Sequence, residues 1–171
     1  HVWEPNGFSL TPLFSEALFR LNIDGSFSNG SGCGNEFDTK HPAFQHYFSE
    51  TLRYWVETYH VDGFRFDLMA LIDRGTMQSA ISGLRLKYPH LLLYGEPWTG
   101  GSTPLHPLER STGDFEKEAP IAVFNDRFRD AIKGYPDDES TGFVTGRFDR
   151  LDEVLTGMLS MESWEEKSYS D

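Results

Sequence analysis

The sequence predicts an α/β protein built around a parallel sheet. Short apolar runs alternate with amphipathic helical segments, and the runs are too continuous for strands that are exposed on one face. The segments follow in the order loop, helix, strand, helix, strand, loop, strand, helix, helix, which is typical of βα units. Because three strands neither close a barrel nor make a stable open sheet, we expect the 171 residues to be part of a longer polypeptide.

The first forty residues are predicted to form a long loop. Glycine, proline, asparagine and serine recur through it. A loop of this length in a compact domain is often functional. Its aromatic side chains predict that it packs against another part of the protein; they are Trp3, Phe8, Phe14, Phe19, Phe27 and Phe37.

A helix is expected to follow, with Pro42 in its first turn and Thr39 or Asp38 as its N-cap. Apolar residues recur along it at intervals of three or four, and these are Phe44, Phe48, Leu52, Trp55, Val56 and Tyr59. A second helix is predicted over 74–87, capped by Asp73 and ended by Pro89.

Three strands are predicted, over 61–67, 91–94 and 121–124. The run of four apolar residues at 91–94 indicates a strand buried on both faces. Helices are expected over 126–133, closed by Gly134, and over 148–159.

The composition excludes several classes of function. With 15 Lys and Arg against 27 Asp and Glu, the net charge is −12, which disfavours binding to nucleic acids or anionic membranes. The content of hydrophobic residues, 38%, is too high for a disordered acidic tail, and no apolar run approaches the ~20 residues that cross a bilayer. A single cysteine, Cys33, excludes an internal disulfide and slightly favours a reducing, intracellular compartment over secretion, without excluding the latter.

Carboxylates follow two of the predicted strands, where reactive groups gather in parallel α/β proteins. In the first strand Arg65 and Asp67 share one face, opposite Phe64 and Phe66. An arginine beside an aspartate lowers the pKa of the carboxyl and keeps it ionised, as a nucleophile requires. The partly apolar setting of Glu96 after the second strand favours its protonated form, as a general acid requires.

Asp67 and Glu96 lie 29 residues apart, which is one βα repeat. Neighbouring parallel strands would place them side by side, and a separation of ~5–5.5 Å would suit retaining glycoside hydrolysis. Alternatively, each acid could cap a helix or pair with a basic residue.

Several segments resemble the α-amylase superfamily, glycoside hydrolase family thirteen. DGFRFDLM (62–69) is similar to its nucleophile segment and YGEPW (94–98) to its acid/base segment. SNGSGCGNE (28–36), LRYW (52–55) with HVDG (60–63), and FND (124–126) with FRDAIKG (128–134) resemble type I pullulanases, which are debranching enzymes. His1 and Val2 match the end of the superfamily's first motif.

The resemblance implies a (β/α)8 TIM barrel, of which the chain supplies roughly the loop after strand three through the helix after strand six. Residues 1–171 would form one partial catalytic domain, with 1–40 as a long active-site loop and 41–171 as βα units. The implied activity is hydrolysis of α-1,6 branch linkages in pullulan, glycogen or starch-derived dextrins. The implied partner is an α-glucan, with no nucleic acid or membrane.

By position in these motifs, the resemblance implies that Asp67 is the nucleophile, Glu96 the general acid/base and Arg65 the group that orients the nucleophile. The implied substrate contacts are His1, Trp98, Phe124, Asn125 and Asp126, and Asn35 and Glu36 are candidates in the cleft loop. The resemblance implies no required cofactor and admits calcium, which some relatives bind; scattered histidines predict no metal site.

The sequence departs from the superfamily in one respect. The family uses a third carboxylate, in a His-Asp pair, and no such pair occurs in this sequence. We interpret this as truncation and expect the 171-residue chain alone to be inactive; the alternative is a degenerate homologue.

Other functions remain open at this stage. An isoamylase, an α-amylase or a branching enzyme of the same superfamily would carry the same two acid motifs. A non-catalytic carbohydrate-binding protein would not need both acids. A nucleotide-binding protein is disfavoured, because the glycines at 30, 32 and 34 lack the G-x-G-x-x-G spacing.

Overall fold

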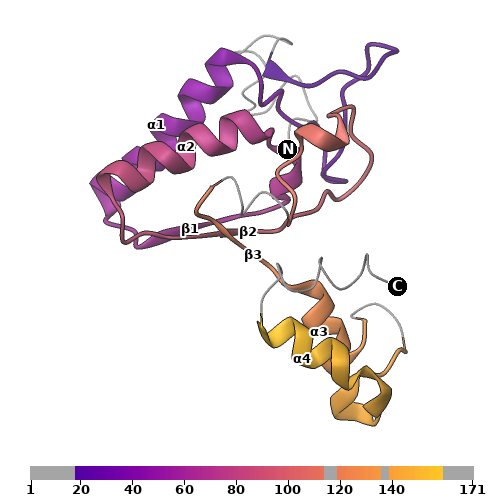
Figure 1. Cartoon of the computed structure of the whole chain (residues 1–171). Helices are drawn as coiled ribbons and strands as arrows, with labels where there is room; N and C mark the ends of the chain where they lie inside the picture. Colours follow the sequence, from indigo (N-terminus) through magenta and orange to yellow (C-terminus); the bar gives the residue numbers. More distant parts are fainter. Residues whose placement is uncertain (1–17, 114–118, 136–138, 160–171) are drawn as a thin grey trace. The chain divides into compact units, whose positions relative to one another are not determined.

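The structure is a computed structural model, and it describes residues 18–113, 119–135 and 139–159 (Figure 1). The chain divides into two compact units, one ending at Val123 and the other starting at Phe124. Among the described residues, no helix is long and apolar enough to cross a membrane.

The first unit contains a parallel three-stranded sheet in the order β1-β2-β3. The strands are β1 (Gly63–Phe66), β2 (Leu92–Gly95) and β3 (Ala122–Val123). Phe66 pairs with Gly95, and Tyr94 pairs with Ala122. The sheet confirms the predicted α/β class and strand order, although β1 and β3 are shorter than the predicted ranges and β2 is displaced by one residue toward the C-terminus.

Two helices, α1 (Pro42–Tyr59) and α2 (Arg74–Lys87), lie on one face of this sheet (Figure 1). The core between helices and sheet is contiguous, and its members are Leu52, Val56, Phe66, Met69, Met77, Ala80, Ile81, Leu84, Leu91, Leu93, Ala119 and Ile121. Phe66 and Leu93 point into this core, because alternate strand residues face the same side.

The other face of the sheet is open among the described residues. Leu92 on this face is 63% exposed, whereas its neighbour Leu93 is 1% exposed. The expectation that residues 91–94 are buried on both faces is therefore wrong for this chain. A hydrophobic run shows that a strand is apolar but does not show which element covers each face.

The bounds of α2 agree with the predicted range of 74–87, but the cap of α1 differs from the predicted one. His41 is the N-cap, and its Nδ1 accepts a hydrogen bond from the Ala43 N–H. Thr39, one of the predicted caps, instead donates its hydroxyl proton to Asp73. Asp73 caps α2 as predicted, since its side chain accepts from the Thr76 N–H.

The described part of the N-terminal loop packs through aromatic rings, as the sequence predicts. Phe19 stacks on Phe37, and Phe37 contacts Phe44 of α1. Phe19 and Phe27 meet edge to face. The earlier aromatics of the loop, Trp3, Phe8 and Phe14, lie outside the described residues.

The second unit contains α3 (Asp126–Lys133) and α4 (Leu151–Leu159). The predicted helix over 148–159 begins as a 3-10 turn, Phe148–Arg150, before the α-helix starts. The two α-helices approach closely at Gly157, where an added Cβ would lie 2.8 Å from Phe128.

Candidate active site

The two predicted catalytic carboxylates lie at the same end of neighbouring strands. Asp67 directly follows β1, and Glu96 directly follows β2. Because Phe66 and Gly95 are paired, the next residue on each strand leaves the sheet at the same level. The sequence-based expectation that one βα repeat brings the acids together is consistent with this placement.

Arg65 joins the two acids. Its Nη1 donates to Asp67 Oδ1 at 2.6 Å, and its Nη2 donates to Glu96 Oε1. The hydrogen bond to Asp67, with the charge of Glu96 adding to it, raises the pKa of Arg65. The sequence predicted the pairing with Asp67, and the structure adds that the same guanidinium holds Glu96.

A backbone amide completes the contacts of Glu96. Leu68 has a left-handed conformation, with φ 45° and ψ 48°, and its N–H donates to Glu96 Oε2 at 3.0 Å. The Met69 N–H donates to the Glu96 carbonyl at 2.8 Å. Leucine rarely takes positive φ, so this turn could not be predicted from the sequence.

The two acids differ in their access to solvent. The Glu96 side chain is 16% exposed, and the Asp67 side chain is 69% exposed. Asp67 therefore presents its free oxygen outward, while Glu96 is held against the backbone of the turn after β1. An open carboxylate beside a more sheltered one can divide the work of nucleophile and proton donor.

A cavity of about 280 Å³ adjoins Asp67. It lies between the N-terminal loop and the turn after β1, and its lining residues are Ser31, Asn35, Glu36, Phe37, Thr39, Phe44, Asp67, Leu68, Leu71 and Ile72. Asn35 and Glu36 were candidates for a cleft loop, and both line this cavity. Glu36 is nevertheless 5% exposed and pairs with Arg20, a partner that sequence reasoning missed.

The remaining predicted contacts fall elsewhere. Trp98 follows β2 in the first unit and is half-buried. Phe124, Asn125 and Asp126 belong to the second unit, where Asn125 caps α3 by accepting from the Phe128 N–H. His1 lies outside the described residues.

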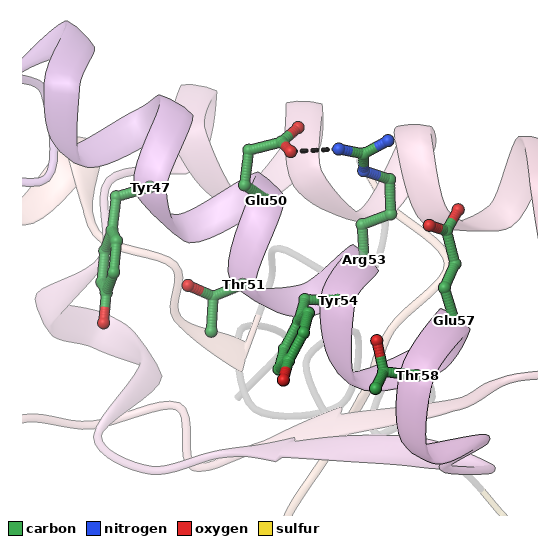
Figure 2. Close-up of a pocket in the computed structure, with 7 residues that line it drawn as sticks. All are labelled: Tyr47, Glu50, Thr51, Arg53, Tyr54, Glu57 and Thr58. Carbon is green, nitrogen blue, oxygen red and sulfur yellow. Dashed lines mark hydrogen bonds and ion pairs between the residues drawn. The ribbon is translucent and has the colours of Figure 1, made fainter.

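A second hollow, of about 380 Å³, lies along α1 (Figure 2). Its lining comes from one helix and comprises Tyr47, Glu50, Thr51, Arg53, Tyr54, Glu57 and Thr58. Glu50 pairs with Arg53 there, as an exposed ion pair within one helix. The described part of the chain contains no group of three His, Cys, Asp or Glu residues that could hold a metal ion.

Comparison with known proteins relates the chain to debranching enzymes. No family model matches. The chain is 30% identical over 165 residues to the pullulanase of Bacillus subtilis and 36% identical over 156 residues to a glycogen debranching enzyme of Salmonella paratyphi B. These alignments cover 96% and 86% of the chain, and each covers 23% of the relative.

Solved structures give the same relation. The pullulanase of Bacillus acidopullulyticus matches with a TM-score of 0.79 and 43% identity over 82% of the chain and 17% of that protein. The type I pullulanase of B. subtilis in complex with maltose matches with a TM-score of 0.84 and 32% identity over 92% of the chain and 22% of that protein. The chain thus resembles about a fifth of each of these proteins, in sequence and in fold.

Proposed function

We propose that this pullulanase-like chain carries the nucleophile and the general acid/base of an enzyme that hydrolyses α-1,6 branch linkages in α-glucans with retention of configuration. One observation carries the proposal: Asp67 and Glu96 follow neighbouring parallel strands and bind the same guanidinium, that of Arg65. The three-stranded sheet is then part of a (β/α)8 barrel, from the loop after its third strand to the helix after its sixth. The pullulanases that match the chain support this assignment.

In the first chemical step, Glu96 gives its proton to the glycosidic oxygen while that oxygen leaves the anomeric carbon. The Asp67 carboxylate attacks the same carbon from the opposite side and forms a covalent glucosyl ester. Arg65 keeps the attacking oxygen in place, because it holds the other oxygen of Asp67 at 2.6 Å. Holding a nucleophile in its reactive geometry removes much of the entropic barrier of the attack.

In the second step, the ionised Glu96 takes a proton from water, and that water displaces Asp67 from the anomeric carbon. Two inversions return the original α configuration. The Leu68 N–H and Arg65 hold the oxygens of Glu96 while it serves first as acid and then as base.

The substrate we propose is an α-glucan oligosaccharide or polysaccharide that contains α-1,6 linkages. Pullulanases from Anoxybacillus that match the chain were solved with maltotriose and maltotetraose. Trp98 stands two residues beyond Glu96, where an indole could stack on a sugar ring. We also propose His1, Phe124, Asn125 and Asp126 as contacts to the substrate. The proposed mechanism requires no cofactor.

The test is the hydrolysis of pullulan by the natural polypeptide that carries this sequence. We expect maltotriose as the product, with the α anomer formed first in the proton NMR spectrum. First formation of the β anomer would contradict the retaining mechanism. Cleavage of linear amylose without cleavage of pullulan would support an α-amylase-type activity instead.

A binding assay separates the enzyme from its non-catalytic alternative. A homologue that only binds carbohydrate would bind maltotriose and leave pullulan intact. A mechanism-based glucosyl inhibitor should label Asp67 in the enzyme, and mass spectrometry of the peptide around 62–69 would detect the label. Binding without labelling or turnover would overturn the catalytic proposal.

A further inference from the structure

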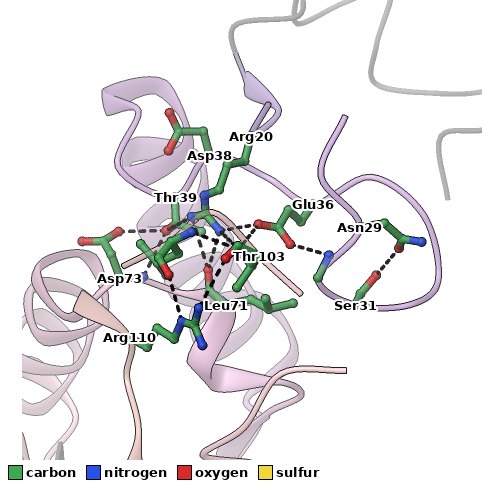
Figure 3. Close-up of polar contacts among 12 residues, drawn as sticks. Arg20, Asn29, Ser31, Glu36, Asp38, Thr39, Leu71, Asp73, Thr103 and Arg110 are labelled. Carbon is green, nitrogen blue, oxygen red and sulfur yellow. Dashed lines mark hydrogen bonds and ion pairs between the residues drawn. The ribbon is translucent and has the colours of Figure 1, made fainter. Parts of the chain in front are cut away.

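A buried polar cluster fastens the N-terminal loop to the rest of the first unit (Figure 3). At its centre are Arg20 and Glu36, which are 8% and 5% exposed. Neither takes part in the chemistry proposed above. Charged side chains are rarely this buried, so the pair calls for a physical explanation.

Both oxygens of the Glu36 carboxylate are occupied. Arg20 Nη1 donates to Oε1 at 2.6 Å, and the Thr103 hydroxyl donates to the same oxygen at 2.6 Å. The Gly30 N–H donates to Oε2 at 2.6 Å. Glu36 therefore joins the turn of the glycine-rich loop to the segment after β2.

The other arm of Arg20 reaches the helix that follows the nucleophile. Its Nη2 donates to the Thr39 hydroxyl at 3.1 Å, and that hydroxyl donates to Asp73 Oδ2 at 2.9 Å. Asp73 is the N-cap of α2. One guanidinium thus connects the loop both to the segment after β2 and to the start of α2.

The cluster lies directly behind one wall of the cavity at Asp67. The loop contributes Ser31, Asn35 and Glu36 to this cavity, and Asp67 and Leu68 contribute from the turn after β1. Packing at the loop is close: a Cβ added to Gly30 would lie 2.1 Å from Glu36 Oε2 and 2.7 Å from Leu71. A shift of the Glu36 carboxylate would therefore move the backbone that forms the wall.

We propose that Arg20 and Glu36 are positioning residues that hold the 28–36 loop as a wall of the α-glucan site beside Asp67. This proposal rests on the function proposed above. A buried ion pair adds little net stability compared with apolar side chains of similar size, but it can select one arrangement of the chain. Here it selects the arrangement in which the loop faces the nucleophile. The pair acts through the loop and not on the reacting atoms.

The test compares the buried ion pair within the N-terminal loop with an exposed ion pair that joins Lys40, at the end of that loop, to Glu109 in the segment after β2. The double variant Arg20→Met/Glu36→Gln removes both buried charges, so that neither is left unpaired. The matched control is Lys40→Met/Glu109→Gln, which removes an exposed pair whose side chains are 49% and 43% exposed. Thr103→Val is a milder third variant, because it keeps both charges and removes only the hydroxyl that donates to Glu36 and accepts from Arg20 and the Leu105 N–H.

Two measurements are made on each variant. In the natural polypeptide that carries this sequence, we expect the buried-pair variant to raise KM for pullulan about tenfold while kcat changes by less than about threefold. In the 171-residue chain, amide hydrogen exchange over 28–36 should accelerate at least about tenfold, because the loop opens more often. Thr103→Val should give smaller shifts of the same sign, and the control should give neither.

The outcomes separate this proposal from the proposed function. Unchanged loop exchange, or equal effects in the control, overturns the positioning role even if pullulan is cleaved. Faster exchange with unchanged KM also overturns it, since the loop would then not contact substrate. A parent polypeptide inactive on pullulan and on other α-glucans overturns the proposed function, and the role of the loop in substrate binding falls with it.

Discussion

Each acid of the candidate site has contacts that suit a different role, although both bind the same arginine. Asp67 is fixed through one oxygen and is otherwise open to solvent. Glu96 is held by a guanidinium and a backbone amide and is largely covered. The difference in exposure agrees with the roles that we propose, attack by Asp67 and proton transfer by Glu96.

This division leads to a prediction about substrates that differ in their leaving group. Asp67→Asn should lower kcat by several orders of magnitude for every substrate, because the covalent step has no nucleophile. Glu96→Gln should do so for pullulan but spare the first step with an aryl maltotrioside, whose leaving group needs no proton. Steady-state and burst kinetics of both variants measure the difference.

Added azide provides the control for these assignments. It should accelerate Glu96→Gln with the aryl substrate and give an α-glycosyl azide, because it displaces Asp67 from the ester with a second inversion and needs no general base. It should not act in this way on Asp67→Asn, which forms no ester. If the two variants respond alike to the leaving group, the roles assigned to the two carboxylates are wrong.

The sequence was sufficient to predict where the two carboxylates lie, because each directly follows a predicted strand. It was not sufficient for the amide of Leu68, since a left-handed leucine depends on the contacts around it rather than on local preference. Arg20 and Glu36 were also hidden, because they are 16 residues apart in a segment with no periodic pattern. Pairings across a long loop are set by tertiary packing.

At the scale of elements, α2 carries an internal glycine that serves no steric purpose. A Cβ added to Gly83 would meet nothing within 4 Å, whereas one added to Gly95 of β2 would lie 2.8 Å from Met69 Sδ and 3.0 Å from the Phe66 carbonyl. Gly83→Ala should stabilise the fold by about 0.5–1 kcal/mol, because alanine loses less backbone entropy in a helix.

Gly95→Ala is the contrasting substitution and should destabilise the fold by about 1–3 kcal/mol through overpacking. Urea unfolding of the 171-residue chain measures both changes. Equal effects of the two substitutions would show that the close approach of β2 to the turn after β1 is not as described.

A salt bridge between α1 and α2 gives a pH prediction at the same scale. Hydrogen bonds from Lys87 first, and then from the Tyr88 hydroxyl, lower the pKa of Glu57. A lowered carboxyl pKa stabilises the fold at pH values above the pKa of the unfolded chain, and this contribution is lost as the pH falls through the folded value. The contribution should be small, because the pair is exposed.

NMR titration of the Glu57 carboxyl carbon measures this shift directly. Lys87→Met should raise the pKa of Glu57 toward its ordinary value and reduce the loss of stability in acid. Lys40→Met, which removes a lysine in the N-terminal loop, is the control and should leave that pKa unchanged. A Glu57 pKa that does not respond to Lys87→Met would contradict the described bridge.

For most elements the sequence predicted the helices better than the strands. The bounds of α2 and α3 match the expected ranges, because their caps, Asp73 and Asn125, and their breaks are local features. β1 and β3 are shorter than their predicted ranges and β2 is displaced by one residue, since pairing with neighbours decides where a strand begins and ends. The choice of His41 over Thr39 as a cap depended on Asp73, which lies 34 residues from Thr39 along the chain.

At the scale of the whole molecule, the uncovered face of the sheet is the feature that most needs explanation. Parallel sheets are normally covered on both faces. Here α1 and α2 cover one face, while Gly63, Arg65, Leu92 and Tyr94 line an open hollow of about 230 Å³ on the other. The Arg65 side chain lies on this open face. Asp67 and Glu96 come two residues after the paired residues Arg65 and Tyr94, so they lie on the same side of the sheet. The candidate site therefore adjoins the uncovered face.

If the open face is the interior of a closed barrel in the natural polypeptide, then one substitution should behave differently in two settings. Leu92→Lys should change the unfolding free energy of the 171-residue chain by less than about 0.5 kcal/mol, because Leu92 is 63% exposed. Leu93→Ala, at a residue 1% exposed, should cost about 2–5 kcal/mol in the same chain. In the natural polypeptide, if it cleaves pullulan as we propose, Leu92→Lys would instead bury an unpaired charge beneath Asp67 and Glu96 and should abolish turnover. Pullulan hydrolysis retained in Leu92→Lys would mean that this face stays open to solvent, and the barrel we propose around Asp67 and Glu96 would then be wrong.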